Sequence, residues 1–340
     1  RAALTIQFGW PKIGLFFQPA RACCGRLLAV EIGFPPYVAD GAEAAALITP
    51  DWASLRLPAR KPDAHKGTAG RLLIVAGSQG MAGAALIAVE AAYRAGAGLV
   101  RIASDPTNRI VLQTAVPEAT FLDRDHLDAA TAGNVHALVA GPGMGADSSG
   151  RAALDAALER TGNVPAALDA DAITLLARDA DSLRVIAATR DIVLTPHVLE
   201  LSRLAGKSVD AIAADPAGVA RAVAERFGCS VLLKGQPSIV ASPDQPLLVN
   251  AVGSSDLAMA GMGDQLAGAI GAFMAAGLNA REAAAVALYY GGRAADLAAL
   301  GRSLSPRDVS MHLRAAFDRP GARRQPFGLP CITFDQPPRW

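Results

Sequence analysis

Short apolar runs alternate with longer alanine-rich stretches between His65 and about Phe317. The short runs have the length of buried strands, and the longer stretches have the length of helices. This alternation is typical of an α/β fold, in which helices cover both faces of a mostly parallel central sheet. The predicted strands are Leu72–Ala76, Leu99–Ala103, Ala137–Ala140, Ala166–Leu168, Ile192–Leu194 and Val231–Leu233, with a hairpin of Ser238–Ala241 and Leu247–Asn250. The predicted helices are Gly83–Ala95, Gly150–Glu159, Ala172–Ala177, Pro216–Phe227, Gln265–Ala276 and Ala280–Leu297.

The same pattern divides the chain into three parts. Residues 1–48 contain short apolar runs broken by Gly and Pro, and Leu27–Val30 is the best strand candidate there. Residues 49–318 carry the regular alternation, which is entered through the proline-punctuated linker Leu57–Asp63. Residues 319–340 are rich in Pro, Arg and Gly without periodicity, which predicts a disordered tail.

Charge and cysteine content narrow the range of partners and compartments. The formal net charge is +1, from 32 basic and 31 acidic residues, so we expect neither nucleic acid nor an anionic membrane as partner. The longest apolar stretch, Leu266–Leu278, is too short to span a bilayer, and no signal peptide is recognisable. The four cysteines, Cys23, Cys24, Cys229 and Cys331, lack Cys-x-x-Cys or zinc-type spacing. These features predict a cytoplasmic protein.

Gly-rich or polar turns follow five of the predicted strands. Ligands of open parallel sheets bind at the carboxyl ends of the strands, where these turns lie. One such turn is a weak sign, because glycine is often present only to allow a positive φ. Five turns at one edge of a sheet favour a ligand site there. The turns are Gly77–Gly83, Gly141–Gly145, Asp169–Asp171, Thr195–Glu200 and Lys234–Ser238.

The segment Gly261–Asp264, with the sequence Gly-Met-Gly-Asp, directly precedes a long apolar helix. Glycines at a helix start let backbone N–H groups approach an anion, and the helix dipole favours negative charge there. Asp264 can be an N-cap, which stabilises a helix by about 1 kcal/mol. Alternatively, Asp264 is a base that deprotonates a substrate hydroxyl for attack on a phosphoryl group. An N-cap does not explain the two alternating glycines, so we favour the base.

Other candidate side chains have a structural as well as a functional interpretation. His197 and Glu200 have i,i+3 spacing and can face a common pocket, although a lone histidine is more often structural. Asp169 and Asp171 can cap the following helix or, less favoured, position a ligand or a hydrated metal ion. Lys234 can place a cation near a nucleotide, but the Walker pattern is absent. The Gly-rich turns also lack the spacing of the dinucleotide fingerprint, so hydride transfer is disfavoured.

Nine segments, taken together and in order, resemble a known family. They are His65–Gly70, Val75–Ser78, Met81–Ala85, Arg94–Val100, Gly141–Gly145, Leu168–Ala172, Leu194–His197, Leu233–Gly235 and Gly261–Asp264, and they extend over about three quarters of the chain. This combination resembles the NAD(P)H-hydrate dehydratases, which belong to the ribokinase-like superfamily. The resemblance implies dehydration of the S epimer of hydrated NADH or NADPH, with ADP as co-substrate in bacterial-type members and ATP in eukaryotic ones. We expect ADP here.

The resemblance also implies roles for individual residues. Asp264 would take the proton of the ring hydroxyl while Gly261, Met262 and Gly263 hold the phosphoryl group, helped by Mg²⁺ that Glu200 contacts through water. The partners would be these small-molecule nucleotides, and we expect a homo-oligomer. Ala84, Gly143 and His197, with Asp264, would line the hydrated-cofactor site, whereas Lys234, Gly235, Gln236, Pro237, Ser238 and Gly263 would hold the AMP portion.

A second resemblance concerns the N-terminal segment. Residues 3–15, Gly25 and Val30–Gly33 resemble the closing segment of the NAD(P)H-hydrate epimerase domain, which precedes the dehydratase in bifunctional proteins. We expect residues 1–48 to be the remnant of such a domain together with a linker, without its catalytic centre. Epimerase activity is therefore not predicted.

Three positions depart from the dehydratase pattern. Met262 replaces the usual Ser or Thr, Val-Leu follows His197 in place of Pro-Gly, and Asp256 stands where Gly is common. Asp256 would add negative charge near the phosphate site. Two alternatives therefore stay open: a ribokinase-like kinase for a small molecule such as a vitamin precursor, and a nucleotide-binding relative without catalysis.

Overall fold

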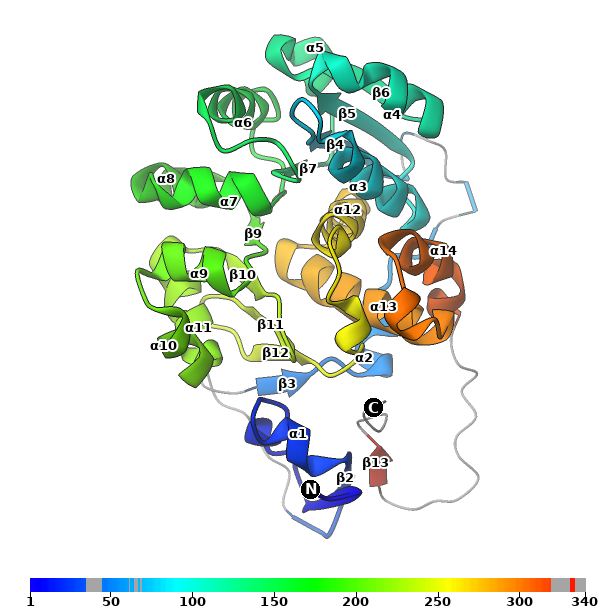
Figure 1. Cartoon of the computed structure of the whole chain (residues 1–340), viewed down its shortest axis with the longest axis vertical. Helices are drawn as coiled ribbons and strands as arrows, with labels where there is room; N and C mark the ends of the chain where they lie inside the picture. Colours follow the sequence, from blue (N-terminus) through cyan, green and yellow to red (C-terminus); the bar gives the residue numbers. More distant parts are fainter. Residues whose placement is uncertain (35–44, 61, 64–66, 68, 319–330, 334–340) are drawn as a thin grey trace.

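The computed structural model describes residues 1–34, 45–60, 62–63, 67, 69–318 and 331–333. Ten strands form one central sheet, in which β11 is antiparallel to both of its neighbours and all other neighbouring pairs are parallel (Figure 1). The strand order is β3 (Ala45–Leu47), β12 (Leu247–Asn250), β11 (Ser238–Ala241), β10 (Ser230–Leu233), β9 (Ile192–Leu194), β8 (Ala166–Leu168), β7 (Ala137–Ala140), β4 (Arg71–Val75), β5 (Leu99–Ser104) and β6 (Thr120–Asp123).

Helices cover both faces of this sheet, as Figure 1 shows. Alternate residues of β4 point to opposite faces, so Leu72 and Leu73 belong to two separate apolar clusters. One cluster is completed by α2 (Pro50–Arg56), α3 (Ala82–Arg94), α4 (Arg109–Ala115), α12 (Met262–Ala275), α13 (Ala280–Ala298) and α14 (Pro306–Phe317). The other is completed by α5 (Ala129–Ala132), α6 (Ser148–Arg160), α7 (Ala170–Ala177), α8 (Ala180–Thr189), α9 (Val198–Ala205), α10 (Val209–Ala214) and α11 (Pro216–Phe227). The predicted α/β fold class is confirmed.

The direction of the chain reverses at β4. From β4 the chain continues to β5 and β6 on one side, and then crosses to β7 and proceeds through β8, β9 and β10 on the other. The switch point therefore lies between β4 and β7, and ligands of open α/β sheets bind outside the carboxyl ends of the strands at such a point.

Helix α12 is held against its neighbours by close backbone contacts. A Cβ atom added at Gly268 would lie 2.0 Å from the carbonyl oxygen of Ala88 in α3, and one at Gly271 would lie 2.3 Å from Cγ2 of Val139 in β7. These positions therefore accept only glycine without a shift of the helix. Because α12 is fixed in this way, the residues at its first turn have a defined position relative to the strand ends.

All strands predicted in the main domain are present, with bounds that differ by no more than a residue. The largest error in a predicted helix boundary is at α12, where the helix expected from Gln265 begins at Met262. The helices expected from Gly150 and Ala172 each begin two residues earlier, at Ser148 and Ala170. Residues 45–47, which fall inside the predicted N-terminal segment 1–48, form β3 and pair with β12, so the segment outside the central sheet ends before Ala45.

A second, small sheet contains β1 (Leu4–Phe8), β2 (Arg26–Val30) and β13 (Cys331–Thr333), and α1 (Arg21–Cys24) lies beside it. The tail was expected to lack folded elements, and β13 does not meet that expectation. The rest of the predicted tail and the motif residues His65 and Lys66 lie outside the described residues. Within the described ranges, every helix is too short or too polar to cross a bilayer.

Candidate active site

Asp264 lies in the first turn of α12, as the third residue of the helix. The N-cap is Gly261, whose φ of 87° is in the left-handed region, and no side chain among the described residues caps this end. The N-cap interpretation of Asp264 is therefore wrong. A Cβ atom at Gly261 would lie 2.9 Å from Cδ1 of Ile87 and 3.1 Å from Cγ of Pro306, so both backbone angle and space require glycine.

The surroundings of Asp264 keep its carboxyl group protonated up to a higher pH than bulk water would. Burial is the first cause, the nearby Asp169 and Asp171 act in the same direction, and Lys234 opposes them; together they raise the pKa of Asp264 to about 7. Near neutral pH, a carboxyl group with this pKa is about half protonated and half ionised, and its ionised form can accept a proton. These properties suit a general base.

Asp169 forms a buried network that the sequence did not single out. Its side chain is 2% exposed, and its Oδ1 atom is 2.8 Å from Nζ of Lys234 and accepts a hydrogen bond of 2.7 Å from Oγ1 of Thr195. The three residues follow β8, β10 and β9, so neighbouring strands bring them together. Asp169 is the N-cap residue of α7, but its carboxylate makes no capping bond within the described chain. The expected capping role of Asp169 is therefore wrong.

Gly263 explains why a second glycine is present at the start of α12. Its backbone is in the ordinary helical region, yet a Cβ atom there would lie 3.3 Å from Nζ of Lys234 and 3.5 Å from Oδ2 of Asp169. The absence of a side chain lets the ion pair approach the helix start. The first turn of α12 thus combines a carboxylate, backbone amides and an ammonium group. The amide of Met262 is partly engaged, because it donates a long bond of 3.4 Å to the carbonyl of Met259.

The turns after β4 and β7 bind each other at the switch point. The amide of Gly77 donates to the carbonyl of Pro142 at 2.9 Å, and that of Ser78 donates to Gly143 at 2.6 Å. A Cβ atom at Gly143 would lie 2.9 Å from Cβ of Ala84. The structure therefore brings together Ala84 and Gly143, which the resemblance placed at one subsite. In the same region, Oδ2 of Asp171 accepts a bond of 2.8 Å from the amide of Gly145, which is again not a capping contact of α7.

His197 and Glu200 form a capping box at the start of α9. Nδ1 of His197 accepts from the amides of Leu199 and Glu200, while Oε2 of Glu200 accepts a bond of 2.8 Å from the amide of His197. Oε1 of Glu200 lies 3.3 Å from Nε2 of His197. The His197 side chain is 49% exposed, whereas Glu200 is buried. The pair thus has a clear structural role, and its half-exposed imidazole still faces solvent.

The turn Lys234–Ser238 is closed by its own hydrogen bonds. The hydroxyl of Ser238 accepts from the amide of Gly235 at 3.2 Å and donates to its carbonyl at 3.0 Å. The amide of Lys234 donates to the carbonyl of Pro196 at 2.9 Å, which ties this turn to the one after β9. A cis peptide bond joins Gln236 and Pro237. The hydrogen bonds of the turn give it a defined shape next to the Asp169 network.

Two of the three departures from the family pattern, Met262 and Asp256, have identifiable contacts in the structure. The side chain of Met262 is partly buried and packs against the apolar cluster that contains α3, α12, α13 and α14. The carboxylate of Asp256 accepts a bond of 2.8 Å from the hydroxyl of Ser254. The charged groups that shift the pKa of Asp264 are Asp169, Lys234 and Asp171.

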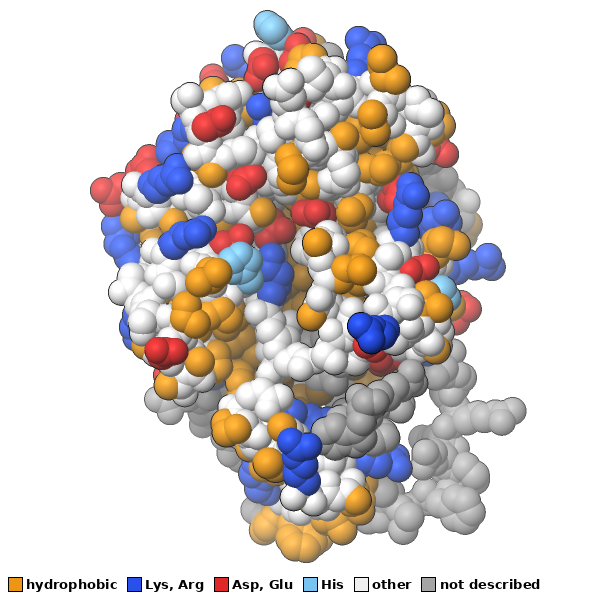
Figure 2. All heavy atoms as spheres, viewed as in Figure 1, with side chains coloured by type: hydrophobic (Ala, Val, Ile, Leu, Met, Phe, Trp, Pro, Cys, Tyr) orange, Lys and Arg blue, Asp and Glu red, His pale blue; other side chains and the backbone are white. Residues whose placement is uncertain are grey.

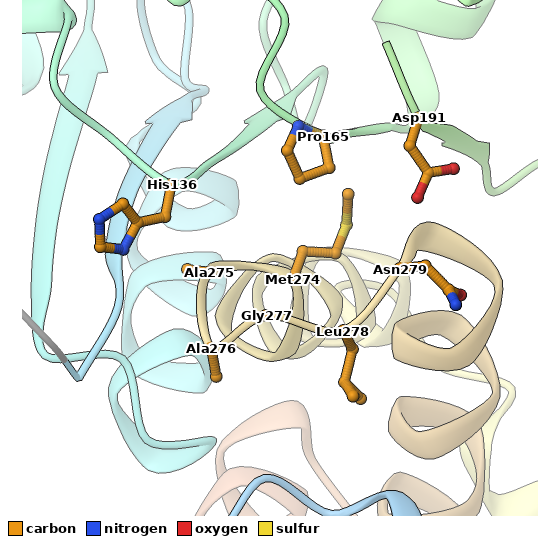
Figure 3. Close-up of a pocket in the computed structure, with 9 residues that line it drawn as sticks. All are labelled: His136, Pro165, Asp191, Met274, Ala275, Ala276, Gly277, Leu278 and Asn279. Carbon is orange, nitrogen blue, oxygen red and sulfur yellow. The ribbon is translucent and has the colours of Figure 1, made fainter.

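The surface over these residues is hollowed. Figure 2 shows acidic, basic and histidine side chains around a depression between α7, α9 and α12. Two other hollows, of about 470 and 560 Å³, lie at the opposite edge of the sheet. Figure 3 shows the smaller one at the carboxyl end of α12, where His136, Pro165 and Asp191 precede their strands. None of the predicted site residues lines either of these two hollows. The titratable and charged groups Asp264, Asp169 and Lys234 lie instead at the carboxyl ends of the strands, which favours that edge as the ligand site. Among the described residues, no group of three or more His, Cys, Asp or Glu side chains is arranged to hold a metal ion.

Known enzymes are similar to this chain in sequence. The bifunctional NAD(P)H-hydrate repair enzyme of Moorella thermoacetica is 36% identical over 89% of this chain, which spans 59% of that enzyme. The ADP-dependent (S)-NAD(P)H-hydrate dehydratase of Neisseria meningitidis is 35% identical over 72% of this chain and 83% of its own length. The chain thus spans well under two thirds of the Moorella enzyme and most of the Neisseria enzyme.

Solved structures are similar to this chain in fold. The ADP/ATP-dependent NAD(P)H-hydrate dehydratase of Bacillus subtilis, crystallised with ATP and Mg²⁺, has a TM-score of 0.70 and 27% identity, covering 81% of this chain and 98% of that one. A ribokinase-like superfamily protein of Enterococcus faecalis shares the fold, with a TM-score of 0.71, 23% identity, and coverage of 84% and 98%. The sequence profile of the NAD(P)H-hydrate dehydratases matches residues 72–314. The chain therefore belongs to the NAD(P)H-hydrate dehydratase family.

Proposed function

We propose that this chain dehydrates the S epimer of hydrated NADH or NADPH at the expense of ADP, giving NADH or NADPH, AMP and phosphate. The observation that carries the proposal is Asp264, a half-buried carboxyl group whose pKa is raised to about 7, in the glycine-lined first turn of α12. Membership of the dehydratase family and the name of the Neisseria relative support the choice of substrate and of ADP.

The chemistry proceeds through a phosphorylated intermediate. Asp264 takes the proton of the ring hydroxyl as the oxygen attacks the terminal phosphorus of ADP, and AMP leaves with the electrons of the broken P–O bond. Phosphate is a far better leaving group than hydroxide, so the ring nitrogen lone pair can expel it. Loss of a proton from the adjacent ring carbon then restores the dihydronicotinamide.

Different residues around Asp264 bind the phosphoryl group, the hydrated nicotinamide and the AMP portion. The amides of Gly261 and Gly263 face the phosphoryl group at the positive end of the helix dipole, where anions are stabilised. Ala84, Gly143 and His197 line the hydrated-nicotinamide side, and the turn Lys234–Ser238 holds the AMP portion.

Mg²⁺ fits this site as an ion carried by the nucleotide rather than by a protein cage. Oε2 of Glu200 accepts the capping-box bond from the amide of His197, and Oε1 lies 3.3 Å from Nε2 of His197, so the contact that we propose between Glu200 and the ion is through water. Mg²⁺ commonly keeps several waters and binds the phosphates of its substrate. When bound, it neutralises charge on the transferring phosphoryl group.

The N-terminal segment is proposed to belong to an epimerase unit. The bifunctional relative from Coxiella burnetii matches 92% of this chain, more than residues 49–340 can supply, so the match extends into the N-terminal segment. The Neisseria enzyme, whose name gives only the dehydratase, matches 72%. This contrast supports an origin of the segment before Ala45 in the upstream part of such enzymes. We further propose a cytoplasmic homo-oligomer.

The function is tested by supplying purified protein with the S epimer of hydrated NADH, ADP and Mg²⁺. We expect the absorbance of reduced nicotinamide to return, with one AMP and one phosphate formed per NADH, and a higher kcat/KM with ADP than with ATP. The R epimer is the control and is not expected to react. AMP binding without any recovery of NADH would refute dehydration and favour the non-catalytic alternative.

A further inference from the structure

The ion pair of Lys234 and Asp169 lies beside the start of α12, where the proposed phosphate binds. Lysine has a flexible stem with several rotatable bonds, so its ammonium group can occupy many positions unless a partner holds it. Here Nζ is 2.8 Å from Oδ1 of Asp169, and the Lys234 side chain is 23% exposed while that of Asp169 is 2% exposed. The ammonium group is therefore held at one point by a buried carboxylate.

Asp169 is itself fixed by contacts from two sides. Thr195 Oγ1 donates to the same Oδ1 atom at 2.7 Å, and the amide of Asp169 donates to the carbonyl of Ala140 at 3.0 Å. Gly141 permits close approach, because a Cβ atom there would lie 1.8 Å from the carbonyl oxygen of Asp169. The carboxylate of Asp169 is therefore held in one place, and its contact with Nζ in turn holds the ammonium group of Lys234 in one place.

The ammonium group lies next to Gly263, the one residue in the first turn of α12 that has no side chain. A Cβ atom at Gly263 would lie 3.3 Å from Nζ of Lys234, so the ammonium group occupies space beside the second residue of the helix that a larger residue would crowd. An ammonium group has three donors, and one is directed at Asp169. The same nitrogen can therefore donate to Asp169 and to a phosphate oxygen held at the helix start.

We propose that Asp169, supported by Thr195, is a positioning residue that holds the Lys234 ammonium group against the first turn of α12, where the ammonium contacts the phosphate of the bound nucleotide. This inference rests on the proposed function in taking the bound anion to be a nucleotide phosphate. It gives Asp169, which the sequence offered as a helix cap or as a group that positions a ligand or a hydrated metal ion, a defined role through Lys234. It also gives Lys234 a contact with phosphate rather than with the base or ribose alone.

The network is better explained by positioning than by stability. An ion pair that is partly removed from water gains little net stability, because loss of hydration offsets most of the attraction between the charges. Instead, the two hydrogen bonds to Oδ1 of the buried Asp169 fix the position of the Lys234 ammonium group. That position is beside Gly263, where no side chain is in the way. A charge-assisted hydrogen bond from ammonium to phosphate is among the stronger polar contacts in proteins.

The test compares AMP with adenosine, which differ only in the phosphate. Titration calorimetry of the full chain is expected to give an AMP affinity at least about tenfold higher than that for adenosine, as for one charge-assisted hydrogen bond. In Asp169→Asn and in Lys234→Met this ratio is expected to fall about tenfold, and the amides at the start of α12 account for any preference that remains. The double variant is expected to show no further fall, because the two residues act through one contact.

Two further variants separate positioning from general damage. Thr195→Val keeps the shape and removes one hydrogen bond to Asp169, so it is expected to lower the ratio by about two- to fivefold even if Asp169→Asn does not fold. Asp191→Asn is the control: this carboxylate accepts from the amide of Ala280 at 2.7 Å at the opposite edge of the sheet, and its loss is expected to leave the ratio unchanged.

Several results would overturn the inference. They are an unchanged ratio in Asp169→Asn or Thr195→Val, additive losses in the double variant, and a wild-type chain that binds adenosine as tightly as AMP. These readouts need no turnover. If the wild type recovers no NADH from hydrated NADH while the ratio behaves as expected, the proposed function fails and the positioning role stands. The converse pattern leaves the function intact and removes the role of Asp169.

Discussion

Asp264 is expected to cost the folded protein stability at alkaline pH. The carboxyl has a pKa of about 7 in the folded protein against an ordinary value of 3.8, so folding raises its proton affinity. Below pH 3.8 both states are protonated and the group contributes no difference. As the pH rises from 3.8 to 7 the unfolded chain ionises while the folded chain keeps its proton. Stability therefore falls across this window and levels off above pH 7.

The size of the effect follows from the two pKa values. Each pKa unit corresponds to about 1.36 kcal/mol, so the buried charge costs about 4 kcal/mol at pH 8.5 and about 2 kcal/mol at pH 5. Asp264→Asn keeps the shape of the side chain and never carries the charge. We expect its free energy of unfolding to exceed that of the wild type by about these amounts at the two pH values.

The measurement is urea-induced unfolding of both proteins without nucleotide at pH 5 and pH 8.5. Asp155→Asn is the matched control, because Asp155 is half-exposed and pairs with Arg151 at 2.9 Å on the surface of α6. Its substitution is expected to change the free energy of unfolding by less than about 1 kcal/mol. Equal stability of Asp264→Asn and wild type at pH 8.5, or a difference that does not grow with pH, would refute the reasoning.

Four further outcomes follow from the same geometry. The kcat/KM for dehydration is expected to rise with pH around an apparent pKa near 7 as Asp264 loses its proton, and a flat profile between pH 6 and 8 would count against this base. Gly263→Ala is expected to raise the free energy of unfolding by up to about 1 kcal/mol through helix propensity, yet to weaken AMP binding in calorimetry, because the Cβ crowds Lys234. Gly261→Ala is expected to lower the free energy of unfolding by about 1–3 kcal/mol, since φ is left-handed and space is lacking; unchanged urea unfolding would contradict this. Gly271→Ala is expected to destabilise by about 1–3 kcal/mol through overpacking of α12 on β7, measured in the same way.

Much of the fold could be predicted because its signals are local. Buried parallel strands such as Leu72–Ala76 are short, continuous apolar runs, and the glycine turns that end them also mark the edge where the site lies. Helix α14 was missed although Ser305, Pro306 and Asp308 carry a capping box with proline at the first helical position. That signal could have been found.

The inner parts of the site depend on contacts between distant segments. Asp169 and Lys234 are 65 residues apart, and only the pairing of β8, β9 and β10 brings them together. Nothing in the local sequence distinguishes Asp169 from an N-cap, because its position before α7 is the same in both cases. The role of Gly263 was hidden for the same reason, since its neighbour is a side chain on another turn.

The start of α12 shows a limit of boundary prediction. Sequence placed Asp264 at the end of a loop, whereas the left-handed Gly261 begins the helix three residues earlier. Because Asp264 is the third residue of the helix and not its N-cap, its carboxylate is not used to cap the helix.

The most direct test of the central claim is a single-turnover experiment with Asp264→Asn, enzyme in excess over the S epimer of hydrated NADH, with ADP and Mg²⁺. The account predicts that recovery of NADH falls by at least about a hundredfold, the range expected for loss of a general base, while the affinity for AMP changes by less than about threefold. Recovery of NADH at the wild-type rate, with AMP affinity intact, would contradict the assignment of Asp264 as the base.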